Sequence, residues 1–572
     1  MLVMSGLAYS LPADAPRLPT AASWRDPEII AAVLLVGAIA VIGLVTAGDY
    51  GITVDEFNAD AYGSKSLAWY TSGFTDRSSF ETVEDTLWFY GPWFHMLTAF
   101  VQSLGLADHW AVRHTLTFLV GLAGIAAVVP MARLALGRWA GVTALSLCLS
   151  TGYLYGSLFF TPIDVPFLFA MTWATFAIMV MAARTVPSWP AAVGAGILSG
   201  LAIATRSSGF ITHAYLLGAM ALCALEAIVN RGGCTRTLLL RIGMRTVCAM
   251  SIAWITAIAL WPWLQVGNPF VHFKSAFVYF ANHPSSWENA HWGQMVISTN
   301  LPSSYVPAQL AARLPEGFLL LLIAGLVAGI AVAAGFLRDA FRALARRGSA
   351  ALASPMLILA RSRQALIFWT AAVVPIAVII VQRSTLYDGI RHVLFLIPML
   401  ALIAAFGFLH LLPILKRFKI AAASVAGVYA AYAVWTLVIL HPLEYVSFNA
   451  LAGGVHGAYQ RFEQDYWAVA ATTALRRLER RLGDDVRFTA NPPSLMICIL
   501  SREGLVAPMF GRPWRLEVKP EKADYLIATP DWPCARNLPV TLVDEVKRFD
   551  RTFAWVYARQ APPGAASPRT EP

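Results

Sequence analysis

Residues 48–91 read GDYGITVDEFNADAYGSKSLAWYTSGFTDRSSFETVEDTLWFYG and follow the first long apolar run of the chain. The segment holds eight carboxylates against two basic residues, although the chain carries a formal net charge of +10. The carboxylates are Asp49, Asp55, Glu56, Asp60, Asp76, Glu81, Glu84 and Asp85, and the basic residues are Lys65 and Arg77. Because exposed loops on a rigid scaffold often carry function, we expect some of these acids to be catalytic side chains at a membrane surface.

The composition excludes an ordinary soluble domain. Of the 572 residues, 58% are hydrophobic and 13% are charged, whereas soluble domains carry about 25% charged residues. Apolar runs of about 18 residues recur along the chain, which predicts an α-helical multispanning membrane protein. The basic residues lie in short loops between these runs, where they set orientation and meet lipid headgroups. We therefore expect the bilayer, and no nucleic acid, as a partner.

The apolar runs predict about eleven spans within a transmembrane domain covering residues 29–440. The expected spans are residues 29–47, 111–131, 139–159, 164–183, 189–206, 209–229, 246–264, 316–337, 365–382, 392–411 and 419–440. Residues 1–28 are a polar cytoplasmic leader without a cleavage pattern, so the first span is retained. Residues 92–106 are too short to cross and are expected to lie along the interface.

The distribution of basic residues gives an orientation. Under this count one set of loops holds Arg133, Arg138, Arg184, Arg231, Arg236, Arg241, Arg245, Arg338, Arg342, Arg346, Arg347, Arg361, Arg363, Lys416, Arg417 and Lys419. The opposite set comprises the acidic loop 48–91, the turn at Asp164, the long loop 265–315 and residues 382–391. The positive-inside rule then places the acidic loop away from the cytoplasm. We expect a multi-pass protein of a bacterial inner membrane, with its site facing the periplasm.

Residues 441–572 are less apolar and are expected to form a small α/β domain on the same extracytoplasmic face. Within them, residues 471–482 are helix-like, and residues 486–490, 523–529 and 552–559 are strand-like. Cys498 and Cys534 could pair if this face meets an oxidising compartment.

Two acidic positions could carry chemistry. Asp55 and Glu56 lie about eight residues past the first span, where a carboxylate could act as general base on a hydroxyl or amine at the interface. The alternative is an N-cap or a solvated loop acid. Asp164 begins a span between Pro162 and Pro166, and it could either cap that helix or point into a site shared with Asp55.

Basic and aromatic residues on the same face could bind a substrate. Arg391 and His392 lie at the outer end of a span, and a guanidinium there suits a phosphate or pyrophosphate, with snorkelling as the alternative. Arg206 is a weaker candidate for the same role. The loop 265–315 contains His283, Trp287, Glu288, His291 and Trp292, which could anchor at the interface, stack on a sugar or bind a metal, although the spacing matches no zinc motif.

Nucleotide chemistry has no signature in this sequence. The chain lacks a P-loop, a Rossmann glycine pattern and a nucleophile elbow, so an activated lipid is the expected energy source. A flippase or transporter of lipid-linked glycans is the main alternative, but repeat-related halves and midplane charges are not evident. A third possibility is an assembly subunit that docks partners through its C-terminal domain.

Four segments together resemble the GT-C glycosyltransferases, over about residues 30–440. They are GITVDEFNADAYG (51–63), YGPWFHMLTAF (90–100) followed by AVRHTLTFLVGLAG (111–124), TPIDVPFLFAMTWATFA (161–177) and DGIRHVLFLIPMLALIAA (388–405). Within that superfamily the likeness is to family 39 and its relatives, which include protein O-mannosyltransferases, the aminoarabinose transferase of lipid A and bacterial Rgt-type transferases. The resemblance implies a GT-C fold.

The same resemblance implies transfer of a sugar from a polyprenyl-phosphate donor to a protein, lipid or glycan acceptor. Asp55 would be the base, and Glu56 and Asp164 would position groups around it. Arg391, with Arg206 or His392, would steady the leaving phosphate, while Tyr90, Trp287 and His291 would contact substrate. A divalent cation, Mg or Mn, would bind at Asp55 and Asp164 if the subfamily uses one.

Overall fold

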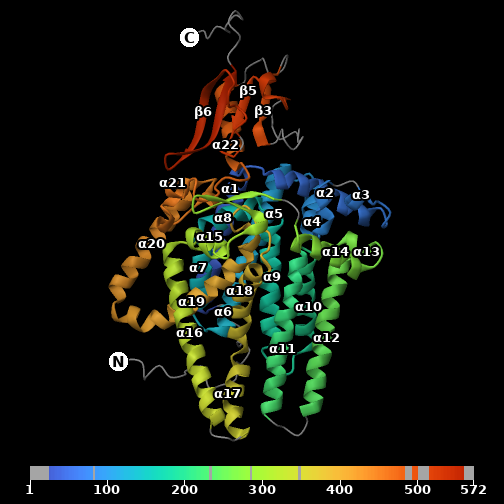
Figure 1. Ribbon diagram of the computed structural model, residues 1–572, viewed down its shortest axis with the longest axis vertical. Helices are drawn as coiled ribbons and strands as arrows, with labels where there is room; N and C mark the ends of the chain where they lie inside the picture. The colour runs from blue at the N-terminus through green and yellow to red at the C-terminus, as the bar shows by residue number, and fades with distance from the viewer. Residues whose placement is uncertain are drawn as a thin grey trace, which may run out of the picture.

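The computed structural model describes residues 25–81, 84–230, 235–283, 286–345, 349–483, 492–499, 514–531 and 533–559. Figure 1 shows a helical bundle with a small β-sheet beyond one of its ends. We call this the sheet end of the bundle and the opposite end the basic end. Most of the expected leader, residues 1–24, lies outside the described residues, as does the expected strand 486–490.

The bundle confirms a multispanning helical protein. Nine helical segments of the described chain are long and apolar enough to cross a membrane. They are α1 (Pro27–Thr46), α5 with α6 (His109–Ala126 and Val128–Ala135), α9 (Asp164–Met181), α11 (Ile211–Val229), α12 (Thr235–Leu260), α16 (Glu316–Ala345), α18 (Arg363–Gln382), α19 (Ile397–Arg417) and α20 (Lys419–Leu440). The other two expected spans differ: α7 (Ala140–Leu149) and α8 (Gly152–Phe160) are bent by 71°, and α10 (Trp189–Ile203) has 15 residues.

Small residues bring some of these helices unusually close. Gly325 of α16 lies against Gly407 of α19, where an added Cβ on Gly407 would come within 2.4 Å of the Gly325 backbone nitrogen. An added Cβ on Gly325 would come within 2.1 Å of the Ile403 carbonyl oxygen. Close backbone approach at small residues is typical of helix packing in membranes, where dispersion contacts replace the hydrophobic effect. Helix α17 (Ser349–Arg361), which the apolar pattern did not predict, joins α16 to α18 at the basic end (Figure 1).

The acidic segment is folded into helices that lie across the sheet end (Figure 1). They are α2 (Val54–Thr71), α3 (Ser78–Glu81) and the short 3-10 helix η2 (Glu84–Phe89), followed by α4 (Trp93–Ser103). Helix α2 begins with a capping box, because Thr53 and Glu56 satisfy each other's backbone and side-chain groups. Helix α4 has 11 residues and is about 17 Å long, which is too short to span a bilayer. This confirms that the region is not a span.

Most of the chain between α12 and α16 also lies near the sheet end (Figure 1). It contains α13 (Pro262–Gln265), α14 (Pro269–Ala281), the hairpin of β1 (Glu288–His291) and β2 (Gln294–Ile297), and α15 (Tyr305–Arg313). The N-terminal end of α12, with Arg236 and Arg241, and the C-terminal end of α16, with Arg338 and Arg342, lie at the basic end. Acidic and basic segments are therefore separated along the long axis of the molecule.

The described part of the C-terminal domain contains helix α22 and a five-stranded sheet. Its elements are α22 (Val469–Leu482), β3 (Ser494–Ile497), β4 (Arg515–Leu516), β5 (Tyr525–Ala528), β6 (Val540–Arg548) and β7 (Arg551–Arg559). The strand order is β4-β3-β5-β7-β6, with β3 parallel to β4 and β5, and β7 antiparallel to β5 and β6. A disulfide joins Cys498 to Cys534. The expected helix 471–482 and strands 523–529 and 552–559 correspond to α22, β5 and β7.

Candidate active site at the sheet end

Arg391 lies between two carboxylates that come from distant parts of the chain. Its Nη1 donates to Asp55 Oδ2 at 2.8 Å, and its Nη2 lies 3.3 Å from Asp388 Oδ2. Asp55 comes from the first turn of α2, whereas Arg391 begins the 3-10 helix η5 (Arg391–Leu396) that leads into α19. The Asp55 side chain is 36% exposed and that of Arg391 only 10%. The site therefore offers an accessible carboxylate held by a largely buried cation.

The turn that presents Arg391 is fixed from two sides. Asp388 and Gly389 both have positive φ, 58° and 69°, which suits an aspartate followed by a glycine. The backbone N–H of Asp388 donates to Asn289 Oδ1 at 3.1 Å, and that of Gly389 donates to Glu463 Oε2 at 2.9 Å. The β1–β2 hairpin and the chain before α22 thus hold the turn in place, and with it Arg391.

Asp164 and Arg206 form a second ion pair in the same region. The Asp164 carboxylate, 7% exposed at the start of α9, accepts a hydrogen bond from Arg206 Nη1. Arg206 follows α10, and its guanidinium lies 5.6 Å from the centre of the Tyr90 ring. Tyr90 can reach this place because Gly91 packs on the Ala204 carbonyl, where an added Cβ would lie 1.6 Å from the oxygen.

The charges of the two ion pairs act on the same neighbouring side chains. Burial raises the pKa of Asp388 to about 6; the Arg391 charge opposes this shift, and the charges of Asp55, Asp531 and Asp164 add to it. Burial likewise raises the pKa of the Tyr387 hydroxyl. The charges of Arg391 and Arg206 oppose this rise, and those of Asp55 and Asp388 add to it. Asp55, Asp164, Arg206 and Arg391 are therefore brought together at the sheet end.

Aromatic rings surround the Arg391 guanidinium. The Tyr387 ring lies 4.6 Å from it and the Trp467 ring 5.2 Å. Trp287 packs near Tyr387, with 6.2 Å between ring centres, and remains 47% exposed. The Tyr90 ring lies 4.5 Å from that of Phe280 in α14. An exposed indole beside a charged, accessible site is suited to stacking on a sugar ring.

The two histidines expected to bind substrate lie in different surroundings. His392 packs edge-on against Tyr387, with ring centres 4.7 Å apart, and so belongs to the Arg391 cluster. His291 is buried in the β1–β2 hairpin, where its Nε2 lies 3.1 Å from Ser304 Oγ and its ring packs near Tyr305. Among the described residues, the partners of His291 are thus Ser304 and Tyr305 at the start of α15 and Phe462, and not the charged residues around Arg391.

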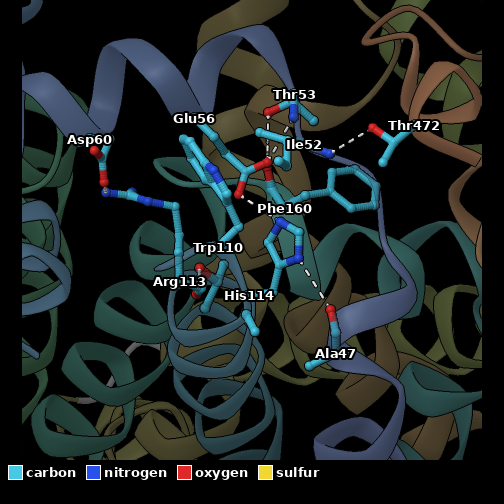
Figure 2. A network of polar contacts seen from close by, with 12 residues as sticks. Ala47, Ile52, Thr53, Glu56, Asp60, Trp110, Arg113, His114, Phe160 and Thr472 are labelled. Atoms are coloured by element: carbon cyan, nitrogen blue, oxygen red, sulfur yellow. Dashed lines mark hydrogen bonds and ion pairs between the residues drawn. The ribbon is translucent and has the colours of Figure 1, made fainter. Parts of the chain in front are cut away.

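Glu56 faces the packed interior and not the accessible carboxylate of Asp55. Figure 2 shows its carboxylate between Thr53 and His114. It accepts the Thr53 backbone N–H at 2.9 Å and lies 3.0 Å from His114 Nε2 of α5. His114 Nδ1 in turn donates to the Ala47 carbonyl at 3.2 Å (Figure 2). Glu56 therefore ties the first turn of α2 to α5 and to the end of α1, which positions Asp55.

Asp60, one turn further along α2 than Glu56, forms a second set of polar contacts with α5. Asp60 accepts a hydrogen bond from Arg113 Nη2 at 2.8 Å (Figure 2). It also lies 2.9 Å from His109 Nε2, which like Arg113 is on α5. The Arg113 side chain is fully buried, so this pair holds α2 against α5 along a further turn. The acidic segment thus uses two of its carboxylates for packing and leaves Asp55 accessible.

The chain that supports the Asp388 turn carries two further carboxyls, Glu463 and Asp465. Burial and the Asp388 charge raise the pKa of Glu463 to about 8, against the opposing effects of Arg313 and the Gly389 N–H. Burial raises the pKa of Asp465 to about 7, although Asp465 accepts a hydrogen bond from Tyr445 and backbone N–H groups at the start of α22. Protons on these carboxyls are therefore held more tightly in the folded protein than in the unfolded chain.

Glu463→Gln is expected to make thermal stability less dependent on pH. Because the pKa of Glu463 is raised, its contribution to stability is complete below its ordinary pKa of 4.5 and is lost as pH rises through about 8. The melting temperature in lipid nanodiscs should fall less between pH 5 and pH 8.5 in the variant than in the wild type, by roughly 3 °C or more. Exposed Glu288→Gln is the control, and identical profiles for all three proteins would contradict the assignment.

The residues at this site do not fit a divalent cation. Among the described residues, no group of three or more histidine, cysteine, aspartate or glutamate side chains is arranged to hold a metal. Asp55 and Asp164, the two expected ligands, are each paired with an arginine. A divalent cation prefers several carboxylate or carbonyl oxygens without competing cations, so we assign no step to a metal.

Sequence reasoning did not single out several residues that build the site. Asp388 was visible as part of an Asp-Gly pair before Arg391, and that pair is itself a signal for a turn with positive φ. Asn289, Glu463 and Trp467 carry no such local signal, because their partners lie about 100, 74 and 76 positions away in the sequence. Only the tertiary fold brings them to Arg391.

Several solved structures share similarity with nearly the whole chain. ArnT from Cupriavidus metallidurans in the apo state superposes with a TM-score of 0.43 at 16% identity, covering 92% of this chain and 97% of that chain. ArnT bound to undecaprenyl phosphate gives 0.42 at 16% identity, covering 94% and 99%. The apo oligosaccharyltransferase of Archaeoglobus fulgidus gives 0.42 at 13% identity, covering 87% and 69%.

No family profile matches the sequence, and the curated proteins give no significant match. The TM-scores and identities of the solved structures are low, so the activity of this chain is inferred from its own residues.

Proposed function

We propose that this protein is a membrane glycosyltransferase of the GT-C type that moves a sugar from a polyprenyl-phosphate donor to an acceptor at the extracytoplasmic face. The observation that supports this most strongly is the pair formed by Asp55 and Arg391, at 2.8 Å, at one end of a membrane-spanning bundle. An accessible base and a buried cation, side by side, match the two demands of the reaction. The acceptor must lose a proton, and the leaving phosphate must gain negative charge.

In the proposed reaction, an acceptor hydroxyl or amine attacks the anomeric carbon of the donor sugar. The bond from that carbon to the phosphate oxygen breaks, and its electron pair stays on the oxygen. Polyprenyl phosphate therefore leaves with one more negative charge, and the acceptor proton passes to Asp55. The Asp55 side chain is 36% exposed and that of Asp164 is 7% exposed, so Asp55 is the one of these two carboxylates that an acceptor can reach.

The arginines are assigned to the phosphate. A guanidinium offers planar paired donors to phosphate oxygens, and cations that face developing charge lower the barrier because they are already in place. Arg391 is the principal contact, and Arg206, with Tyr90 beside it, is the second. His392 packs on the Tyr387 ring, which also contacts Arg391, and is assigned to the same phosphate-binding group. Asp164 keeps Arg206 in position.

Two observations support the extracytoplasmic placement. The disulfide between Cys498 and Cys534 lies in the C-terminal domain at the sheet end, and disulfides form and persist mainly in oxidising compartments. The arginine-rich ends of α12 and α16 lie at the opposite end of the bundle, as the positive-inside rule requires for cytoplasmic loops. A bacterial inner membrane fits both.

The test is donor-dependent release of polyprenyl phosphate by purified protein in nanodiscs. Each candidate polyprenyl-phosphate sugar is incubated with a mixture of hydroxyl and amine acceptors, and a nucleotide sugar serves as the negative control. We expect release from at least one lipid donor and none from the nucleotide sugar. Movement of an intact lipid-linked sugar across the bilayer, without release from any donor, would instead identify a flippase.

Metal removal is expected to leave the activity unchanged. Asp55 and Asp164, the two expected metal ligands, are each paired with an arginine, so the phosphate charge meets guanidinium groups instead of a metal ion. Initial rates measured in excess EDTA should stay within about twofold of those with added Mg²⁺ or Mn²⁺. A loss of activity in EDTA that either ion restores would show that this assignment is wrong.

A further inference from the structure

Arg391 already has anionic partners before any phosphate arrives. Nη1 donates to Asp55 at 2.8 Å, and Nη2 lies 3.3 Å from Asp388. The arginine is 8% exposed as a residue, and its buried Nε has no hydrogen-bond partner among the described residues. Because both Nη groups already face carboxylates, a phosphate that binds to either of them must displace one of the carboxylates.

The two carboxylates differ in how easily they can be displaced. Asp388 lies on the same turn as Arg391, and hydrogen bonds from its own and the following backbone N–H fix that turn to Asn289 and Glu463. Asp55 is the more exposed carboxylate, 36% against 27%. It reaches Arg391 from a different helix, and its helix is anchored through Glu56 rather than through Asp55 itself. Rotation of the Asp55 side chain alone would break the contact.

Building on the proposed function, we propose that the donor phosphate displaces Asp55 from Arg391, so that the base becomes free only when the donor is bound. Asp388 keeps its contact with Arg391 Nη2 during this exchange, so the Arg391 charge always has an anionic partner. The phosphate then occupies the Nη1 donor that Asp55 has left. Asp55, released next to the bound sugar, is available to accept the acceptor proton. The ion pair in the free protein is thus a resting state that couples donor binding to activation of the base.

This exchange implies an order of binding. An acceptor that arrives first meets a carboxylate already engaged with Arg391, so deprotonation waits for the donor. After transfer, polyprenyl phosphate has one more negative charge than the donor and holds Arg391 until it leaves. Its departure returns Asp55 to Arg391, which resets the site. Asp55 and the phosphate therefore compete for the same donor group.

Competition can be measured without any chemistry, by binding of polyprenyl phosphate to the purified protein in nanodiscs. Asp55→Asn removes the competing anion while Asp388 remains as a partner for Arg391, so the buried charge is not left unpaired. We expect this variant to bind polyprenyl phosphate at least about fivefold more tightly than the wild type. Asp531→Asn removes a charge that also acts on Asp388, but no described contact joins Asp531 to Arg391; its affinity should change by less than about twofold.

The gain must also depend on Arg391. In an Arg391→Gln background, Asp55→Asn should produce no tightening, as expected for two residues that act through one contact. Equal tightening with and without Arg391, equal effects of Asp55→Asn and Asp531→Asn, or no effect of Asp55→Asn would each overturn the proposal. If Arg391→Gln does not fold, the Asp531→Asn comparison decides. Wild-type protein that binds no polyprenyl phosphate would overturn the proposed function itself, which is a different outcome.

Discussion

Asp55→Asn is expected to lower kcat/KM for sugar transfer by about 10²–10⁴-fold, the usual contribution of a general base. The amide keeps the size of the side chain but cannot accept the acceptor proton. Because Asp55 is not the residue that anchors α2, the variant should fold normally. The measurement is the initial rate of polyprenyl phosphate release over a range of donor concentrations, with melting temperature as the check on folding.

Asp76→Asn is the matched control for this variant. Asp76 lies in the same acidic segment, but its carboxylate accepts the Ser78 N–H in an exposed turn beyond α2. Its activity should match that of the wild type. Under the competition described above, Asp55→Asn should also retain or improve binding of polyprenyl phosphate, which separates a lost proton acceptor from a lost binding site. An Asp55→Asn enzyme with wild-type kcat would exclude Asp55 as the base.

Arg391→Lys is expected to lower kcat by about 10²–10³-fold, as when a preorganised donor facing developing charge is removed. Lysine keeps the positive charge but cannot make the planar, paired contacts of a guanidinium or span both Asp55 and Asp388. It also loses the contacts of the guanidinium with the Tyr387 and Trp467 rings. KM for the lipid donor should rise as well, because the phosphate contact is present in the ground state.

The comparison for this variant is Arg383→Lys, at the exposed end of α18. This substitution keeps the charge at the same end of the bundle and should leave both kcat and KM within about twofold of the wild type. If Arg391→Lys is as active as Arg383→Lys, then the phosphate is not held by Arg391. A rise in KM alone, with kcat unchanged, would mean that the contact is equally strong in the ground state and the transition state, so that it aids binding without accelerating the chemical step.

Much of the fold was predictable because long apolar runs have few alternatives in a bilayer. All eleven expected spans correspond to helices, and the exclusion of residues 92–106 as a span follows from their length alone. The break between α7 and α8 at Ser150 and Thr151 was not predicted, since an apolar run carries no signal for a 71° bend. Helix α2 was missed although Thr53 and Glu56 form a capping box that the sequence displays.

The site was predictable to the extent that its residues lie at the ends of spans. Asp55 and Asp164 were selected as acids on one membrane face, and Arg391 and Arg206 as arginines at the outer ends of spans that suit a phosphate. The structure brings these residues together in two ion pairs. The different orientations of Asp55 and Glu56 could not be read from the sequence, since they depend on His114 of α5. The support for the Arg391 turn could not be read from the sequence either, because no local pattern links Glu463 to Gly389.

The central claim is that Asp55 acts as a base in a direct displacement of polyprenyl phosphate. Its most direct test is the anomeric configuration of the first-formed product, determined by NMR from a donor of known configuration. A single displacement places the acceptor on the face opposite the leaving phosphate, so the account predicts inversion. Retention would require a sugar bound covalently to a side chain such as Asp55, and would contradict the role of Asp55 as a base.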